Sequence, residues 1–69
     1  MTESGRQILQ ALADGEWWTM AQLAKEIHQC GRKTKAAVSG CQVAGLVIAE
    51  VTTYPAQFQI TQAGRDALQ

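Results

Sequence analysis

Residues 19–47 read TMAQLAKEIHQCGRKTKAAVSGCQVAGLV, and this stretch holds two runs of apolar residues at the spacing of a helix. The first run repeats at i, i+3, i+4 and i+7, as one buried helical stripe does, and consists of Met20, Leu23, Ala24 and Ile27. The second run has the same spacing and consists of Thr34, Ala37, Val38 and Cys41. Thr19 is placed to cap the first helix, and Gly45 to end the second. The stretch therefore predicts two helices joined by a short turn over residues 28–31.

Another helix and a short extended segment are predicted before this pair. Residues 3–13 contain no proline and carry apolar side chains at helical spacing, and Gly15 suits the left-handed conformation that closes many helices. Glu16-Trp17-Trp18 is predicted to be extended, because aromatic side chains fit a half-buried pleated surface. Trp17 and Trp18 then point to opposite faces, so one enters the core and the other stays at the surface.

The pattern changes from helical to alternating after Gly45. Residues 47–52 and residues 57–61 both alternate with period two, which predicts two strands. The intervening residues 54–56 include the single proline, which cannot sit inside a central strand, and are predicted to form a turn. Thr61 is placed to cap a final short helix over residues 62–68.

The expected order is helix, short strand, helix, helix, strand, strand, short helix. This order predicts an α+β fold of the winged helix-turn-helix type, with a three-helix bundle, a β-hairpin wing and a short C-terminal helix. The 69 residues fit a single domain, 1–69, with the helix-turn-helix over about 19–45 and the wing over about 46–61. Gly40, inside the second helix of the pair, is expected to permit close packing of a neighbour.

Composition and motifs favour a soluble, cytoplasmic protein without a membrane partner. No apolar run approaches the roughly 18 residues of a membrane span, and the N-terminus lacks the features of a signal peptide. Cys30, Cys41 and His28 fall short of the four ligands of a structural zinc site, so no metal and no cofactor are expected. The carboxylates are scattered and no phosphate-binding loop occurs, so the chain is predicted not to be an enzyme.

The charge is neutral overall but unevenly placed along the chain. Residues 1–30 carry a net charge of −2, residues 31–45 carry +3, and residues 46–69 carry −1. The positive excess comes from Arg32, Lys33 and Lys35, in the first half of the second predicted helix of the pair. Neutral net charge argues against strong non-specific binding to polyanions, whereas a local basic cluster favours a localised contact.

Three short motifs resemble those of bacterial winged-helix regulators of the MarR and PadR kind. Leu23-Ala24-Lys25-Glu26-Ile27 is similar to the first helix of their helix-turn-helix, and Gly45-Leu46-Val47 falls where they carry "GLV" after the recognition helix. Ile60-Thr61-Gln62-Ala63-Gly64-Arg65 is similar to the "LTxxGR" that leaves their wing. The resemblance implies a DNA-binding transcription regulator that inserts the helix over about 31–44 into the major groove of duplex DNA.

Helical geometry indicates which side chains would contact DNA. If the second apolar run faces the core, the opposite face carries Arg32, Lys35, Ala36, Ser39 and Gln42, with Lys33 on its flank. Arginine and lysine donate to phosphate or guanine, and glutamine pairs with adenine. The wing, residues 47–60, contains no lysine or arginine and would contact DNA only through polar groups such as Thr53 and Tyr54.

Other functions remain open at this point. Three cations predict a shallow salt dependence, and reading a palindrome needs two copies, so a homodimer or a protein partner is expected. A winged helix that reads left-handed duplexes would account for Pro55, but Ser39 stands where such a domain is expected to carry an aromatic residue. Alternatively, the chain is a protein-interaction module without DNA binding, anchored by Trp17 or Trp18, because tryptophan is enriched at interface hot spots.

Overall fold

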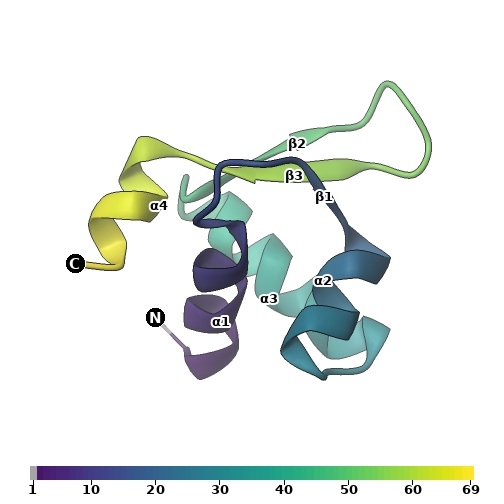
Figure 1. Ribbon diagram of the computed structural model, residues 1–69, viewed down its shortest axis with the longest axis horizontal. Coiled ribbons are helices and arrows are strands. Elements are labelled where there is room, and N and C mark those ends of the chain that lie inside the picture. Colours follow the sequence, from purple (N-terminus) through teal and green to yellow (C-terminus); the bar gives the residue numbers. More distant parts are fainter. Residues whose placement is uncertain (1) are drawn as a thin grey trace.

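A computed structural model describes residues 2–69 and contains the predicted elements in the predicted order (Figure 1). The elements are α1 Glu3–Leu12, β1 Trp18–Thr19, α2 Met20–Ile27, α3 Gly31–Val43, β2 Val47–Glu50, β3 Gln57–Ile60 and α4 Gln62–Ala67. The first three helices lie together beneath the sheet, the β2–β3 hairpin projects beyond them on one side, and α4 lies at the other end (Figure 1). This arrangement is the α+β winged helix-turn-helix architecture expected from the sequence.

The three strands form one antiparallel sheet in the order β1-β3-β2. Phe58 of β3 lies opposite Trp18 of β1 and Ala49 of β2, so these three side chains share one face. That face covers the helices, and the core beneath it consists of Ile8, Leu9, Leu12, Leu23, Ile27, Val38, Cys41, Val47, Phe58 and Ile60. Nearly all of these residues belong to the predicted apolar runs, as a core this small requires.

Helix starts in this fold depend largely on threonine. The Oγ1 atoms of Thr2, Thr19 and Thr61 each accept a backbone N–H from the third residue of the helix that follows. At Thr19 the side chain of Gln22 also accepts the N–H of Thr19, at 2.9 Å, which completes a capping box. The caps at Thr19 and Thr61 were expected from the sequence; helix α3 is different, because Cys30 at its N-cap position makes no side-chain capping bond.

The two motifs that flank the hairpin meet each other in space. Gly45 has a φ of 78°, which lets the chain turn sharply after α3, and the Leu46 carbonyl then accepts the N–H of Thr61 at 3.0 Å. Gly64 packs against this junction so closely that a Cβ atom there would overlap the Leu46 carbonyl oxygen and the side chain of Ile60. Gly45 is therefore required by its positive φ, and Gly64 by the close packing at this junction.

The predicted strand at Glu16–Trp18 is wrong in its bounds, because β1 is only Trp18–Thr19. Gly15 has a φ of 80°, and the Asp14 carboxylate accepts the N–H of Glu16 at 2.9 Å, so Glu16 belongs to a turn. The structure also ends α3 at Val43, one residue before the predicted end, with Ala44 as its C-cap.

The interpretation of Gly40 is also wrong. A Cβ atom built on Gly40 meets nothing within 4 Å, and the residue is exposed. No neighbour within residues 2–69 packs closely over this position, so intramolecular packing does not explain the glycine.

Candidate nucleic-acid interface

Helix α3 is amphipathic in the way the sequence predicts. Thr34, Val38 and Cys41 are buried, and Ala37 is half-buried beside them. The Thr34 hydroxyl donates to the Cys30 carbonyl at 2.9 Å, which satisfies the one buried polar side chain of this face. The opposite face is therefore directed outward, and every α3 residue predicted to contact DNA is exposed: Arg32, Lys33, Lys35, Ala36, Ser39 and Gln42.

The charges on α3 are placed against the helix dipole. Cations are favourable near the C-terminus of a helix and unfavourable near its N-terminus. In α3 the first turns carry Arg32, Lys33 and Lys35, the first turn has no acidic residue, and the last turn has no basic one. Among residues 2–69, the three charged groups take part in no ion pair or hydrogen bond. The arrangement does not stabilise the helix, and it leaves three exposed cations with no partner among residues 2–69 at the start of α3.

The wing brings polar and aromatic side chains to the tip of the hairpin. Thr53 is exposed, and Tyr54 is 99% exposed at the tip. Glu50, at the end of β2, accepts the backbone N–H and the hydroxyl of Thr52, and these hydrogen bonds lower the pKa of its carboxyl group. The only charge on the wing is therefore a stabilised carboxylate, which would repel a phosphate placed beside it.

A groove of about 430 Å³ separates α3 from the wing. Lys35 lines it on the helix side, and Tyr54 and Pro55 line it on the wing side. The structure thus brings together two predicted DNA-contact residues from separate elements, Lys35 and Tyr54. Thr53 does not line this groove, although it lies at the same hairpin tip.

The sequence reasoning missed a third wall of this groove. The start of α2 contributes Thr19, Met20 and Ala21. The backbone amides of a first helical turn attract anions, because they lack acceptors within the helix and lie at the positive end of the dipole. In the sequence, Thr19 followed by Gln22 marks the start of the helix. The sequence does not indicate which side of the molecule this helix start faces.

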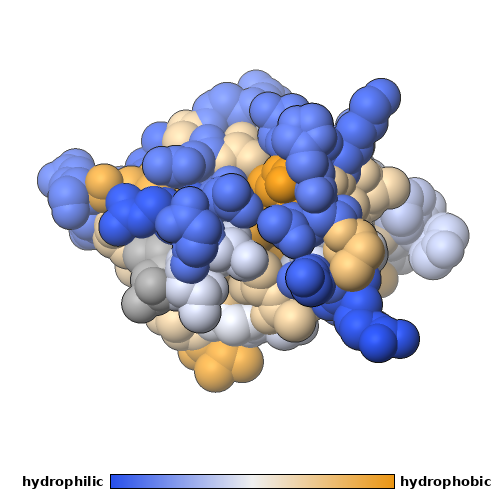
Figure 2. Space-filling model, turned by 90° about the horizontal axis from the view of Figure 1, so that it is seen from below, coloured by the Kyte–Doolittle hydropathy of each residue, from blue (hydrophilic) through white to orange (hydrophobic). Residues whose placement is uncertain are grey.

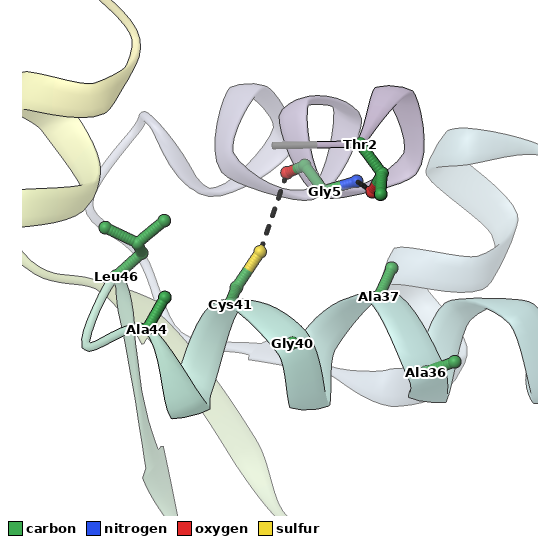
Figure 3. A pocket seen from close by; sticks show the side chains of 8 residues that line it. All are labelled: Thr2, Gly5, Ala36, Ala37, Gly40, Cys41, Ala44 and Leu46. Atoms are coloured by element: carbon green, nitrogen blue, oxygen red, sulfur yellow. Dashed lines mark hydrogen bonds between the residues drawn. The ribbon is translucent and has the colours of Figure 1, made fainter.

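The opposite flank of α3 forms a second hollow, of about 400 Å³, against the first turn of α1 (Figure 3). Small side chains line it along α3, and only Leu46 is a large apolar residue among them (Figure 3). The Cys41 thiol lies within it, 3.7 Å from the Gly5 carbonyl, and burial raises the pKa of this thiol. Ala36 therefore stands at the border between the predicted DNA-contact face and a smooth apolar flank.

The two tryptophans separate as predicted, one inward and one outward. Trp18 is half-buried, packs against the core and lies opposite Phe58. Trp17 is 41% exposed and is the one available as a protein-contact residue.

The helical face turned away from the sheet is mainly hydrophilic, with small apolar patches between polar side chains (Figure 2). Over the described residues, no helix combines the length and the apolar character that crossing a membrane requires.

Comparison with solved structures identifies the fold. The transcriptional regulator BldR from Sulfolobus solfataricus is 25% identical, with a TM-score of 0.86 over 99% of this chain and 50% of that chain. A MarR family regulator from Silicibacter pomeroyi is 22% identical, with a TM-score of 0.89 over 99% of this chain and 47% of that one. BpsR of Bordetella bronchiseptica, whose DNA binding is described as regulated by 6-hydroxynicotinic acid, is 14% identical, with a TM-score of 0.88 and coverages of 99% and 50%.

These likenesses define the class of domain. The chain has the winged helix-turn-helix fold in the form found in MarR family transcription regulators, and it spans about half the length of those proteins. No protein-family model and no curated protein matches the sequence. The solved relatives are described as transcription regulators rather than as enzymes.

Proposed function

We propose that this protein is a sequence-specific DNA-binding domain of a small bacterial transcription regulator that acts in the cytoplasm. In this proposal α3 enters the major groove of duplex DNA. Arg32, Lys33 and Lys35 contact phosphates or guanine acceptors, and Ser39 and Gln42 contact base edges further along the groove. Ala36 is small enough to let the helix approach the bases.

One observation carries the proposal: three cations that have no partner within residues 2–69 lie at the start of α3, where the helix dipole disfavours them. A set of residues that opposes local stability is expected at functional sites. The likeness to proteins described as transcription regulators, such as BldR, supports the same function. Helix-turn-helix proteins in general place the second helix of the motif in the major groove, and α3 is that helix here.

The wing is assigned a secondary role. Tyr54 lines the same groove as Lys35, and Thr53 is exposed at the same hairpin tip, which supports a contact of both residues with the DNA backbone beside the helix. Because the wing lacks cations, one copy of the domain binds duplex DNA weakly, and two copies or a partner protein are needed to read a palindromic site.

The proposal is tested by titrating the 69-residue chain with duplex DNA at several salt concentrations and following fluorescence anisotropy. We expect the logarithm of the association constant to fall with the logarithm of salt concentration with a slope of about −2 to −3, as two or three phosphate contacts require. Replacing Arg32, Lys33 and Lys35 together by alanine should weaken binding at least tenfold and bring the slope close to zero.

A matched control removes cations elsewhere on the surface. Arg6 and Lys25 are exposed and lie on α1 and α2, so the Arg6→Ala, Lys25→Ala double variant should bind within twofold of the parent. Equal losses in both variants would mean that binding reflects total charge, and the recognition role of α3 would be rejected.

A second candidate function is a winged-helix protein-interaction module that does not bind DNA. The neutral net charge, the wing without cations and the exposed Trp17 favour it. In that case the parent chain would show no salt-dependent binding to duplex DNA in the same titration.

A further inference from the structure

The turn between α1 and β1 forms a hollow of about 290 Å³ whose lining is both acidic and aromatic. Its walls are Asp14, Glu16, Trp17, Trp18 and Gln22. None of these residues belongs to α3 or to the hairpin, so this hollow is separate in its residues from the proposed DNA interface.

The turn is held in place by side chains from distant parts of the sequence. The Arg65 guanidinium donates to the Ala13 carbonyl at 3.1 Å, and the Gln59 amide donates to the Gly15 carbonyl at 2.7 Å. The Trp18 indole N–H donates to the Asp14 carboxylate at 3.2 Å. A ligand therefore meets a wall that is already ordered, and its binding does not have to supply the ordering free energy.

The hollow carries two carboxylates, and neither forms an ion pair within residues 2–69. The Asp14 carboxylate accepts hydrogen bonds from the Trp18 indole N–H and the Glu16 backbone N–H. The Glu16 carboxylate takes part in no hydrogen bond or ion pair within residues 2–69. Arg65 binds the same turn through the Ala13 carbonyl, but it forms no ion pair with either carboxylate in the described chain.

The Glu16 carboxylate, which has no partner within residues 2–69, and the partly exposed Trp17 indole together suit an arginine side chain best. The guanidinium of arginine is planar and always charged, stacks on aromatic rings and pairs with a carboxylate through two parallel hydrogen bonds. Lysine carries a compact, strongly hydrated charge and cannot make the planar, two-bond contact.

We propose that this hollow binds an arginine side chain of a protein partner, stacked on Trp17 and paired with Glu16. Trp17 supplies the contact surface, since it is 41% exposed beside the hollow. Trp18 and Asp14 fix the wall behind it. The site operates whether or not α3 binds DNA, and it gives a domain of this size a way to join a partner while the recognition helix stays free.

The test uses the whole 69-residue chain labelled with 15N and a capped peptide, Gly-Arg-Gly-Arg-Gly. We expect saturable shifts of the Trp17 indole N–H and the Glu16 amide with this peptide, and none with the matched peptide Gly-Gln-Gly-Gln-Gly. Trp17→Ala and Glu16→Gln should each weaken the interaction at least fivefold, whereas Trp17→Tyr should retain most of it.

Folding and DNA binding provide the controls. The dispersed spectrum and the Trp18 indole signal should be retained in Trp17→Ala, because Trp17 lies outside the core. The Arg32→Ala, Lys33→Ala, Lys35→Ala variant should bind the arginine peptide as the parent does, and Trp17→Ala should bind duplex DNA as the parent does. Equal shifts with both peptides, or an undiminished response in Trp17→Ala, would overturn the arginine site and leave the DNA proposal untouched.

Discussion

The absence of a side chain at Gly64 lets α4 pack closely against the junction at the end of the wing. The Leu46 carbonyl and the Ile60 side chain occupy the space into which a Cβ atom would project. Gly64→Ala is therefore expected to destabilise the protein by about 1–3 kcal/mol, the usual range for overpacking. Urea denaturation followed by circular dichroism measures this change, and an unchanged midpoint would show that α4 shifts freely away from the sheet.

Gly40 should behave in the opposite way. Its surroundings are open in the described structure, so Gly40→Ala adds helix propensity without a clash. We expect a gain of roughly 0.5–1 kcal/mol in the free energy of unfolding, since glycine is that much less favourable than alanine inside a helix. The same urea titration checks it, and Gly64→Ala serves as the paired comparison. A loss of stability would mean that the helix interior is tighter at this position than its exposure indicates.

At the scale of the element, α3 should show a conflict between stability and binding. Lys33 is the third residue of the helix, where a carboxylate is favoured by the dipole and can accept backbone N–H groups. Lys33→Glu is therefore expected to stabilise the fold by roughly 0.3–1 kcal/mol. The same change should weaken duplex DNA binding at least tenfold, because it places a negative charge against phosphate.

Two measurements on one sample decide this point: a urea titration for stability and fluorescence anisotropy for binding. Lys33→Gln, which removes the charge without reversing it, should fall between the parent and Lys33→Glu in both. If the glutamate variant lost stability as well as binding, Lys33 would have a structural role that its exposure does not reveal.

At the scale of the whole molecule, the order of the elements and the buried side of α3 could be predicted from the sequence. Both follow from periodicity, which is a local property: the spacing of Thr34, Val38 and Cys41 is the same in the sequence and in the folded helix. The inward and outward division of the two tryptophans was also predictable, but which of them points inward depends on the register of Trp18 against Phe58.

What escaped prediction depends on contacts between residues far apart in the chain. The side chains of Arg65 and Gln59 donate hydrogen bonds to carbonyls of the α1–β1 turn that lie 52 and 44 residues earlier in the chain. No local sequence pattern predicts hydrogen bonds over such separations. The groove that joins Lys35 to Tyr54 has the same origin, because it exists only once the hairpin lies beside α2 and α3. The sequence also does not predict that Cys30, at the N-cap position of α3, makes no side-chain capping bond.

That uncapped start has a consequence for motion. With no side chain on its orphan amides and three like charges beside them, the first turn of α3 has less to hold it closed than the starts of α1, α2 and α4. It should open and close locally without unfolding the core, as segments of low local stability do. A polyanion bound at this turn would supply hydrogen-bond acceptors for the amides and negative charge for the cations. The proposed DNA-contact surface would then become fully ordered only when DNA is bound.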